Sequence, residues 1–274
     1  MVSAVLLLLM AAPAPPGKLI DVGGYRVHLN CIGTGNPVVI IVGGFSFDWN
    51  LVQPEAAKFG RVCTYDVSGT AWSDPGPANP TCAGRVEEIH HLLKAANIDR
   101  PFVLVGFSTG ALFARLYARD YPHDLSGMVI VDHAFLPPKA APAPITSNPD
   151  SPPILIFATP ITAGIEDEPG YDTLPQSIRD LHRWAEPISP GRPTAELAEA
   201  CNASVGSAGL GDMPLAVVST ANDSRGYADL QKRLLALSTN SRQFIANHSF
   251  HSIEISQPEI VVEAMRQVVE ATRK

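Results

Sequence analysis

Short apolar runs rich in β-branched residues alternate along the chain with longer segments in which apolar residues recur at helical spacing. This alternation predicts a parallel sheet whose strands are joined by crossover helices. The alternating segment 25–29 predicts an antiparallel edge strand, and the fully apolar segment 38–42 predicts a strand covered on both faces. Further strands are predicted at 61–65, 102–105, 128–131, 215–218 and 242–245, and helices at 83–96, 111–120, 227–238 and 258–273.

Between residues 137 and 212 the alternation of strand-like and helix-like segments is interrupted, and the chain becomes rich in Pro, Ala, Gly and Ser. Two short helical segments are predicted within it, 174–184 and 195–203. So long an excursion between core strands is typical of a cap or lid over a binding site. Phe157 and Trp184 favour a folded cap, because a solvated loop would not carry such side chains.

The N-terminus carries a short apolar run, residues 5–12, followed by a Pro-rich stretch. The run is too short to span a bilayer, which takes roughly 20 residues, but it resembles the apolar region of a secretory signal. We therefore expect a signal peptide and a secreted or periplasmic protein. A cytoplasmic location is the alternative, because the first basic residue is Lys18. The expected organisation is a signal peptide at 1–16, a core in two parts at 17–136 and 213–274, and a cap at 137–212.

Composition narrows the function classes. The 274 residues are 46% hydrophobic and 17% charged, which excludes a disordered or coiled-coil protein. With 20 Lys and Arg against 27 Asp and Glu, the net charge is −7. Because the chain is negative and has no run of Lys or Arg, no nucleic-acid partner is expected. The cysteines lack C-x-x-C spacing and the histidines lack an H-E-x-x-H pattern, so no metal is expected. In an exported protein a Cys63–Cys82 disulfide is a candidate, and buried thiols are the alternative.

Ser108 lies at the centre of Gly106-Phe107-Ser108-Thr109-Gly110, between the predicted strand 102–105 and the predicted helix 111–120. This is the G-x-S-x-G nucleophile elbow in its strand–turn–helix context. The turn is so tight that side chains at both glycine positions would collide with neighbouring backbone, and the serine must adopt a strained conformation. Its hydroxyl would then stand above the sheet, near a helix N-terminus that stabilises developing negative charge.

Two further segments extend a resemblance to the α/β-hydrolase fold family over residues 21–272. Gly43-Gly44-Phe45 follows the first long apolar strand, where the family usually has His-Gly and an oxyanion-hole residue. Residues 65–77 resemble the family's Tyr-Asp-x-x-Gly-x-Gly-x-Ser turn. The elbow is similar to that of cofactor-free haloperoxidase and perhydrolase members, in which Phe often precedes the serine. The resemblance implies an α/β-hydrolase fold, with a mostly parallel central sheet, flanking helices and a small cap, and no cofactor.

The resemblance also implies roles for single residues. The N–H groups of Phe45 and Thr109 match the oxyanion donors of the family. Several positions depart from the family's pattern: Gly43 replaces His, Val67 replaces Arg, and Ala71, Ala111 and Thr220 replace Gly.

A nucleophilic serine needs a base and an orienting carboxylate. Pro258-Glu259 resembles the family's closing pattern and places the base at His251, with His248 as the alternative. Asp223 follows a Pro-strand segment in the order Ser, Asp, His that the fold requires, and is the favoured acid. Asp132, at the end of the strand after the elbow, is its rival, since both loops end at the same edge of the sheet.

These roles predict a serine hydrolase that cleaves a carboxylic ester or lactone of a small to medium organic molecule through an acyl-enzyme on Ser108. A perhydrolase or a carbon–carbon bond hydrolase using the same triad is the first alternative. A catalytically idle binding member of the fold is the second. No membrane span is expected.

Overall fold

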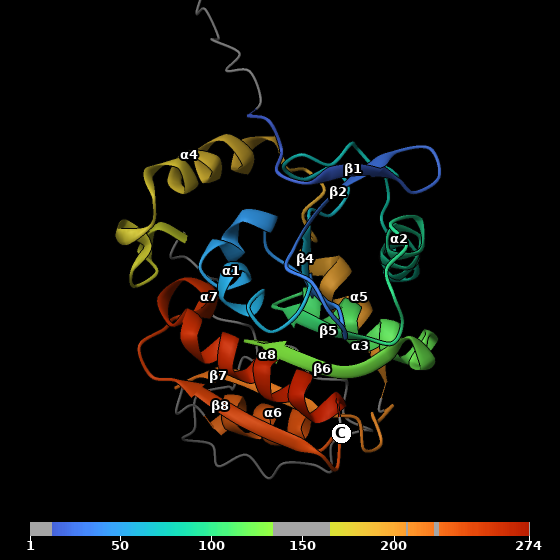
Figure 1. Ribbon diagram of the computed structural model, residues 1–274, viewed down its shortest axis with the longest axis vertical. Coiled ribbons are helices and arrows are strands. Elements are labelled where there is room, and N and C mark those ends of the chain that lie inside the picture. Colours follow the sequence, from blue (N-terminus) through green and yellow to red (C-terminus); the bar gives the residue numbers. More distant parts are fainter. Residues whose placement is uncertain (1–12, 134–164, 207, 222–224, 274) are drawn as a thin grey trace, which may run out of the picture.

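The computed structural model describes residues 13–133, 165–206, 208–221 and 225–273. In this part of the chain an eight-stranded sheet runs through the centre of the molecule in the order β1-β2-β4-β3-β5-β6-β7-β8 (Figure 1). The strands are β1 (Lys18–Asp21), β2 (Arg26–Ile32), β3 (Val39–Val42), β4 (Val62–Tyr65), β5 (Phe102–Phe107), β6 (Leu125–Val131), β7 (Leu215–Thr220) and β8 (Ser241–Ala246).

The predicted mixture of strand directions is confirmed. β1 and β2 form an antiparallel edge, and the six strands from β4 to β8 run parallel. The pattern missed β1, because its four residues alternate only weakly between exposed and half-buried. All four residues of β3 are buried, as the fully apolar run predicts for a central strand.

Helices cover both faces of the sheet. On one face α2 (Cys82–Ala95), α3 (Gly110–Asp120), α5 (Ala195–Val205) and α6 (Arg225–Leu235) contribute to a core that contains Ile40 and Val42. On the other face α1 (Gln53–Ala56) and α8 (Pro258–Thr272) pack against Val39 and Ile41. Alternate β3 residues thus enter opposite layers, which explains why a period-two pattern is absent from this strand.

The region expected to form a cap divides into two parts where it is described. α4 (Gln176–Ala185) lies at the upper left in Figure 1 and packs on the loop after β3. Trp184 of α4 also lies near Trp72 of the loop after β4, with ring centroids 5.4 Å apart and the rings tilted by 40°. α5, by contrast, packs against α2 and α3 and belongs to a layer of the core. Phe157 lies outside the described residues.

The candidate Cys63–Cys82 disulfide is wrong, and so is the alternative of buried thiols, because all four cysteines form disulfides. Cys63 pairs with Cys31, its direct neighbour across the antiparallel strands β2 and β4, with their Cα atoms 4.0 Å apart. Cys82, at the start of α2, pairs with Cys201 in α5. The strand pairing that sets Cys31 opposite Cys63 is a tertiary feature, so the sequence distance between cysteines did not reveal it.

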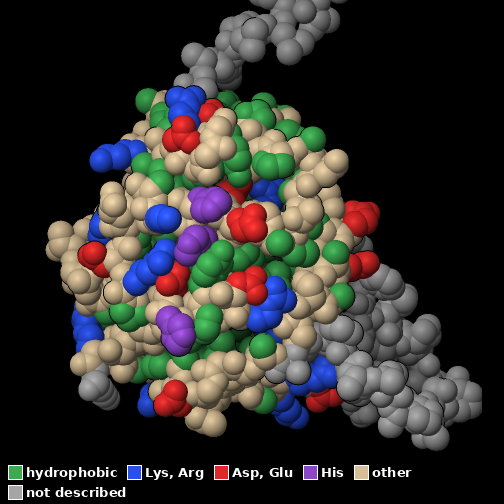
Figure 2. Space-filling model, turned by 90° about the vertical axis from the view of Figure 1, so that its right-hand side faces the viewer, with side chains coloured by type: hydrophobic (Ala, Val, Ile, Leu, Met, Phe, Trp, Pro, Cys, Tyr) green, Lys and Arg blue, Asp and Glu red, His purple; other side chains and the backbone are tan. Residues whose placement is uncertain are grey.

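The surface mixes both signs of charge. On the face where α2 lies, Lys and Arg side chains alternate with Asp and Glu side chains, with apolar side chains between them (Figure 2). Among the described residues no helix has the length and apolar character needed to cross a membrane.

Candidate active site

Ser108 occupies a strained turn between β5 and α3. Its φ of +52° lies in the left-handed region, which a non-glycine residue rarely adopts. A Cβ atom at Gly110 would lie 2.1 Å from the Val42 carbonyl oxygen, and one at Gly106 would lie 2.6 Å from Cα of Ala111. The two glycines are therefore required by close backbone approach, as the motif predicts.

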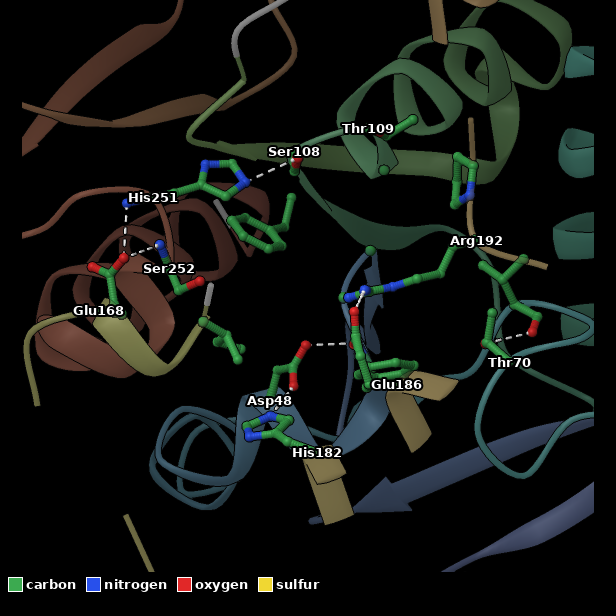
Figure 3. Close-up of a pocket in the computed structure, with 18 of the residues that line it drawn as sticks. Asp48, Thr70, Ser108, Thr109, Glu168, His182, Glu186, Arg192, His251 and Ser252 are labelled. Atoms are coloured by element: carbon green, nitrogen blue, oxygen red, sulfur yellow. Dashed lines mark hydrogen bonds and ion pairs between the residues drawn. The ribbon is translucent and has the colours of Figure 1, made fainter. Parts of the chain in front are cut away.

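Asp132 and His251 come from two other strand ends, and His251 contacts both Asp132 and Ser108; Figure 3 shows the contact between His251 and Ser108. Asp132 directly follows β6, and His251 lies in the loop between β8 and α7 (Ile253–Ser256). Nε2 of His251 is 3.1 Å from Oγ of Ser108, and Nδ1 is 2.5 Å from Oδ2 of Asp132. Each distance is within hydrogen-bonding range, so a serine, an imidazole and a carboxylate form one continuous chain.

Asp132 is also held on its other side. Its φ is +38°, a left-handed conformation at the end of a strand, and its Oδ1 accepts a hydrogen bond from the hydroxyl of Tyr227 at 2.5 Å. The Tyr227 hydroxyl in turn accepts from the Thr220 N–H at 3.1 Å. Burial and the Asp132 charge raise the pKa of Tyr227, so its phenol stays protonated and acts as a donor.

The alternative site residues lie elsewhere. His248 is exposed, and its backbone N–H donates to Gln257. Asp223, the acid favoured by the sequence pattern, lies outside the described residues. The carboxylate that contacts His251 in the structure is that of Asp132.

The two expected oxyanion donors differ in their surroundings. Thr109 is the N-cap residue of α3 and lines the pocket. The N–H of Phe45 donates to Oδ2 of Asp48 at 2.6 Å, so this donor would have to exchange Asp48 for a substrate oxygen. Oδ1 of Asp48 is 2.8 Å from Nε2 of His182 in α4, and both side chains are buried.

Two departures from the family pattern have geometric explanations. A Cβ atom at Gly43 would lie 2.4 Å from the carbonyl oxygen of Phe107, which leaves no room for a histidine in this backbone. Ala71 adopts a φ of +42°, a conformation that favours the glycine usual in the family. Neither departure removes a group from the site.

A cavity of about 600 Å³ opens over Ser108, and core and insertion both line it. The core supplies an aromatic and aliphatic wall: Phe45, Val67, Phe107, Phe113 and Phe250. The insertion supplies Ile165, Glu166, Glu168, His182, Arg183, Glu186, Arg192 and Pro193, most of them polar or charged. Arg192 pairs with Glu186 (Figure 3). Its guanidinium lies 4.7 Å from the centroid of the Phe45 ring.

Sequence reasoning missed four residues that line the cavity or hold a residue of the site: Asp48, Glu168, His182 and Tyr227. Their partners are far away in the chain, since 134 residues separate Asp48 from His182 and 95 separate Asp132 from Tyr227. No local pattern marks such pairs, because each depends on how the insertion and α6 fold back over the sheet.

Comparison with known proteins supports the architecture. A family described as alpha/beta hydrolase fold matches residues 36–156. The chain is 26% identical to the uncharacterized protein YqjL of Bacillus subtilis (strain 168) over 248 residues, which span 86% of this chain and 85% of that protein.

Two solved structures share the fold. A thermophilic esterase from Thermogutta terrifontis aligns with a TM-score of 0.68 and 19% identity, over 95% of this chain and 100% of that one. The meta-cleavage product hydrolase of Pseudomonas fluorescens IP01 aligns with a TM-score of 0.66 and 18% identity, over 92% of this chain and 98% of that one. At these identities the likeness establishes the fold and not the substrate. The sheet topology and the family match over residues 36–156 together show that the chain has an α/β-hydrolase fold.

Proposed function

We propose that the protein is a serine hydrolase that cleaves carboxylic esters or lactones of small to medium organic molecules. The observation that carries the proposal is the continuous contact chain from Oγ of Ser108 through His251 to Asp132. The strained turn at Ser108 supports it, because a nucleophile elbow presents the hydroxyl to a substrate in the pocket.

In the proposed mechanism, Nε2 of His251 takes the hydroxyl proton of Ser108 as Oγ attacks the ester carbonyl carbon. Asp132 accepts the Nδ1 proton of His251 in a hydrogen bond, which fixes the tautomer and stabilises the imidazolium. The N–H of Thr109 stabilises the oxyanion, joined by the N–H of Phe45 once substrate displaces Asp48. The imidazolium then protonates the leaving alcohol, and water activated by His251 releases the acid from Ser108.

The pocket favours a modest substrate. A cavity of about 600 Å³ falls within the range of small-molecule sites, roughly 300–1,000 Å³. The aromatic and aliphatic wall of its core side suits an apolar acyl group, and the charged residues of its insertion side suit a polar leaving group.

Hydrolysis of a carbon–carbon bond is a second candidate function, and the chain shares its fold with a protein described as a meta-cleavage product hydrolase. The same serine, histidine and carboxylate could serve it, as they could a perhydrolase. Ester hydrolysis is preferred because it requires only a triad and an oxyanion donor at the site.

Export to an oxidising compartment is part of the proposal. The two disulfides, Cys31–Cys63 and Cys82–Cys201, support it, because such bonds persist in secreted and periplasmic proteins and are rare in the cytosol.

The test is hydrolysis of a p-nitrophenyl ester series of increasing acyl length by the wild type and three variants. We expect Ser108→Ala and Asp132→Asn each to lower kcat by about 10³-fold or more, the latter because the imidazole loses its tautomer partner. Asp223→Asn is the matched carboxylate control, with an expected change of less than about threefold.

Other outcomes would redirect the assignment. A large loss in Asp223→Asn with none in Asp132→Asn would move the acid to Asp223. Wild type no faster than Ser108→Ala on every ester, together with no labelling of Ser108 by a fluorophosphonate, would favour the idle binding member. Labelling of Ser108 without ester turnover would favour the carbon–carbon bond hydrolase.

A further inference from the structure

Of the three residues in the contact chain, His251 has the weakest support from the sheet. Ser108 and Asp132 directly follow strands, and their N–H groups continue the ladder by donating to Val131 and Val218. His251 lies in a loop after β8, at the edge of the sheet. Some other group must therefore hold this loop in place over Ser108.

Glu168 is that group. This residue of the insertion is buried, and its carboxylate accepts four hydrogen bonds from four consecutive residues of the loop, of which Figure 3 shows those from His251 and Ser252. Oε1 accepts from the Ser249 hydroxyl at 3.0 Å and the Phe250 N–H at 2.9 Å. Oε2 accepts from the His251 N–H at 3.0 Å and the Ser252 N–H at 3.1 Å.

These bonds account for the charge of Glu168. Burial acts to raise the pKa of this carboxyl, but the N–H groups of His251, Phe250 and Ser252 and the Ser249 hydroxyl outweigh it and hold the pKa below its usual range. Within the described residues no Lys or Arg forms an ion pair with Glu168. The negative charge of Glu168 is therefore stabilised by hydrogen bonds from the loop. The same bonds hold the loop in its conformation, so a loss of the charge would weaken them.

We propose that Glu168 is a positioning residue for His251, and that the insertion thereby completes the catalytic site as well as covering it. The proposal rests on the proposed function, in which His251 is the general base. In this role Glu168 acts through the loop and not on the reacting atoms. It acts by fixing the backbone of residues 249–252, so that the imidazole lies between Asp132 and Ser108.

The experiment compares Glu168→Gln, Glu168→Asp and the control Asp167→Asn, an exposed acid one position away. A carboxamide keeps one acceptor oxygen, and in either orientation its NH₂ group faces at least one backbone N–H of the loop that has lost its acceptor, so the loop must shift. Because a displacement of about 1 Å can cost about 10²-fold in rate, we expect Glu168→Gln to lower kcat by about 10- to 100-fold, with KM changed less than about threefold. Glu168→Asp keeps the charge and should recover part of the loss.

A second readout does not depend on activity. The proton shared by His251 Nδ1 and Asp132 should give a far-downfield ¹H NMR signal in the wild type and in Asp167→Asn. We expect this signal to broaden or disappear in Glu168→Gln and to be retained in Glu168→Asp. A thermal unfolding curve for each variant separates loss of position from loss of fold.

Retention of both kcat and the downfield signal in Glu168→Gln would overturn the proposal. So would a lower unfolding temperature with the downfield signal unchanged, because Glu168 would then serve stability alone. If Glu168→Gln does not fold, the test uses Glu168→Asp instead. Loss of the downfield signal in Glu168→Asp with an unchanged kcat would then contradict the proposal. A wild type that is inactive on every ester would contradict the proposed function. The downfield ¹H signal would still test, independently of activity, whether Glu168 positions His251.

Discussion

The Tyr227 hydroxyl donates to Oδ1 of Asp132 at 2.5 Å, while Oδ2 of the same carboxylate faces His251. Asp132 is thus shared between a phenol from α6 and an imidazole from the loop after β8. Each donor stabilises part of the negative charge of the carboxylate. The hydrogen bond from Tyr227 therefore makes Asp132 a weaker acceptor for the Nδ1 proton of His251.

Tyr227→Phe should therefore strengthen the hydrogen bond between Asp132 and His251 and move the acidic limb of the kcat/KM profile to higher pH. We expect the plateau rate to fall less than about tenfold, since the imidazole keeps its partner. The profile would be measured on a p-nitrophenyl ester. Tyr25→Phe removes a similar hydrogen bond to Glu88 away from the pocket, and should leave the profile unchanged. A shift to lower pH in Tyr227→Phe would contradict this reading of Asp132.

His182 joins the insertion to the loop after β3. Its Nε2 contacts Asp48 and its Nδ1 is 3.1 Å from the Tyr171 hydroxyl. His182→Ala leaves the buried Asp48 carboxylate without this partner, and should lower the free energy of unfolding by about 1–3 kcal/mol in urea titrations. His123→Ala, at an exposed position, is the control. Equal stability of the two variants would show that Asp48 is satisfied by the Phe45 N–H alone.

The Cys82–Cys201 disulfide ties α2 to α5 across 119 residues of sequence. Because a cross-link over a long loop restricts the unfolded chain strongly, the Cys82→Ala/Cys201→Ala variant should lose about 2–5 kcal/mol of unfolding free energy. The comparison is equilibrium unfolding of the variant and wild type without reductant. Reduction of the wild type by dithiothreitol should lower its stability as well, and no effect of either treatment would contradict a stabilising role.

Glu254 is fully buried in α7, and neither carboxyl oxygen has a hydrogen-bond partner among the described residues. Burial, with the charges of Asp48, Glu168 and Asp132 adding to it, raises its pKa well above the ordinary 4.5. The unfolded chain releases this proton above about pH 4.5 while the folded chain retains it. Stability from this group therefore falls by about 1.4 kcal/mol per pH unit as pH rises, up to the folded pKa.

Glu254→Gln has no proton to lose and should not show this slope. In urea titrations from about pH 5 to about pH 7, we expect its stability relative to wild type to increase with pH. The control is Glu87→Gln, at an exposed position of α2. A constant difference between Glu254→Gln and wild type over this range would mean that Glu254 is ionised in the folded protein.

Local pattern was enough for much of the fold. The apolar run at 38–42 and the elbow around Ser108 depend on contacts within a few residues, so their strand, turn and helix follow from hydrophobic period and glycine placement. The edge strand β2 was predicted for the same reason, although its continuation to Ile32 was not. β1 was not predicted, because its four residues are too few to show a pattern of apolar and polar positions.

By itself the sequence determined the class of fold, the turn that carries Ser108 and the loop that carries His251, because each is written in adjacent residues. Only the tertiary structure decided which cysteines pair, which carboxylate contacts His251 and which insertion residue holds its loop. Asp132 and His251 are 119 residues apart, and Glu168 and His251 are 83 apart. Such contacts arise when strand order and the path of the insertion bring distant segments together, and no local propensity encodes that path.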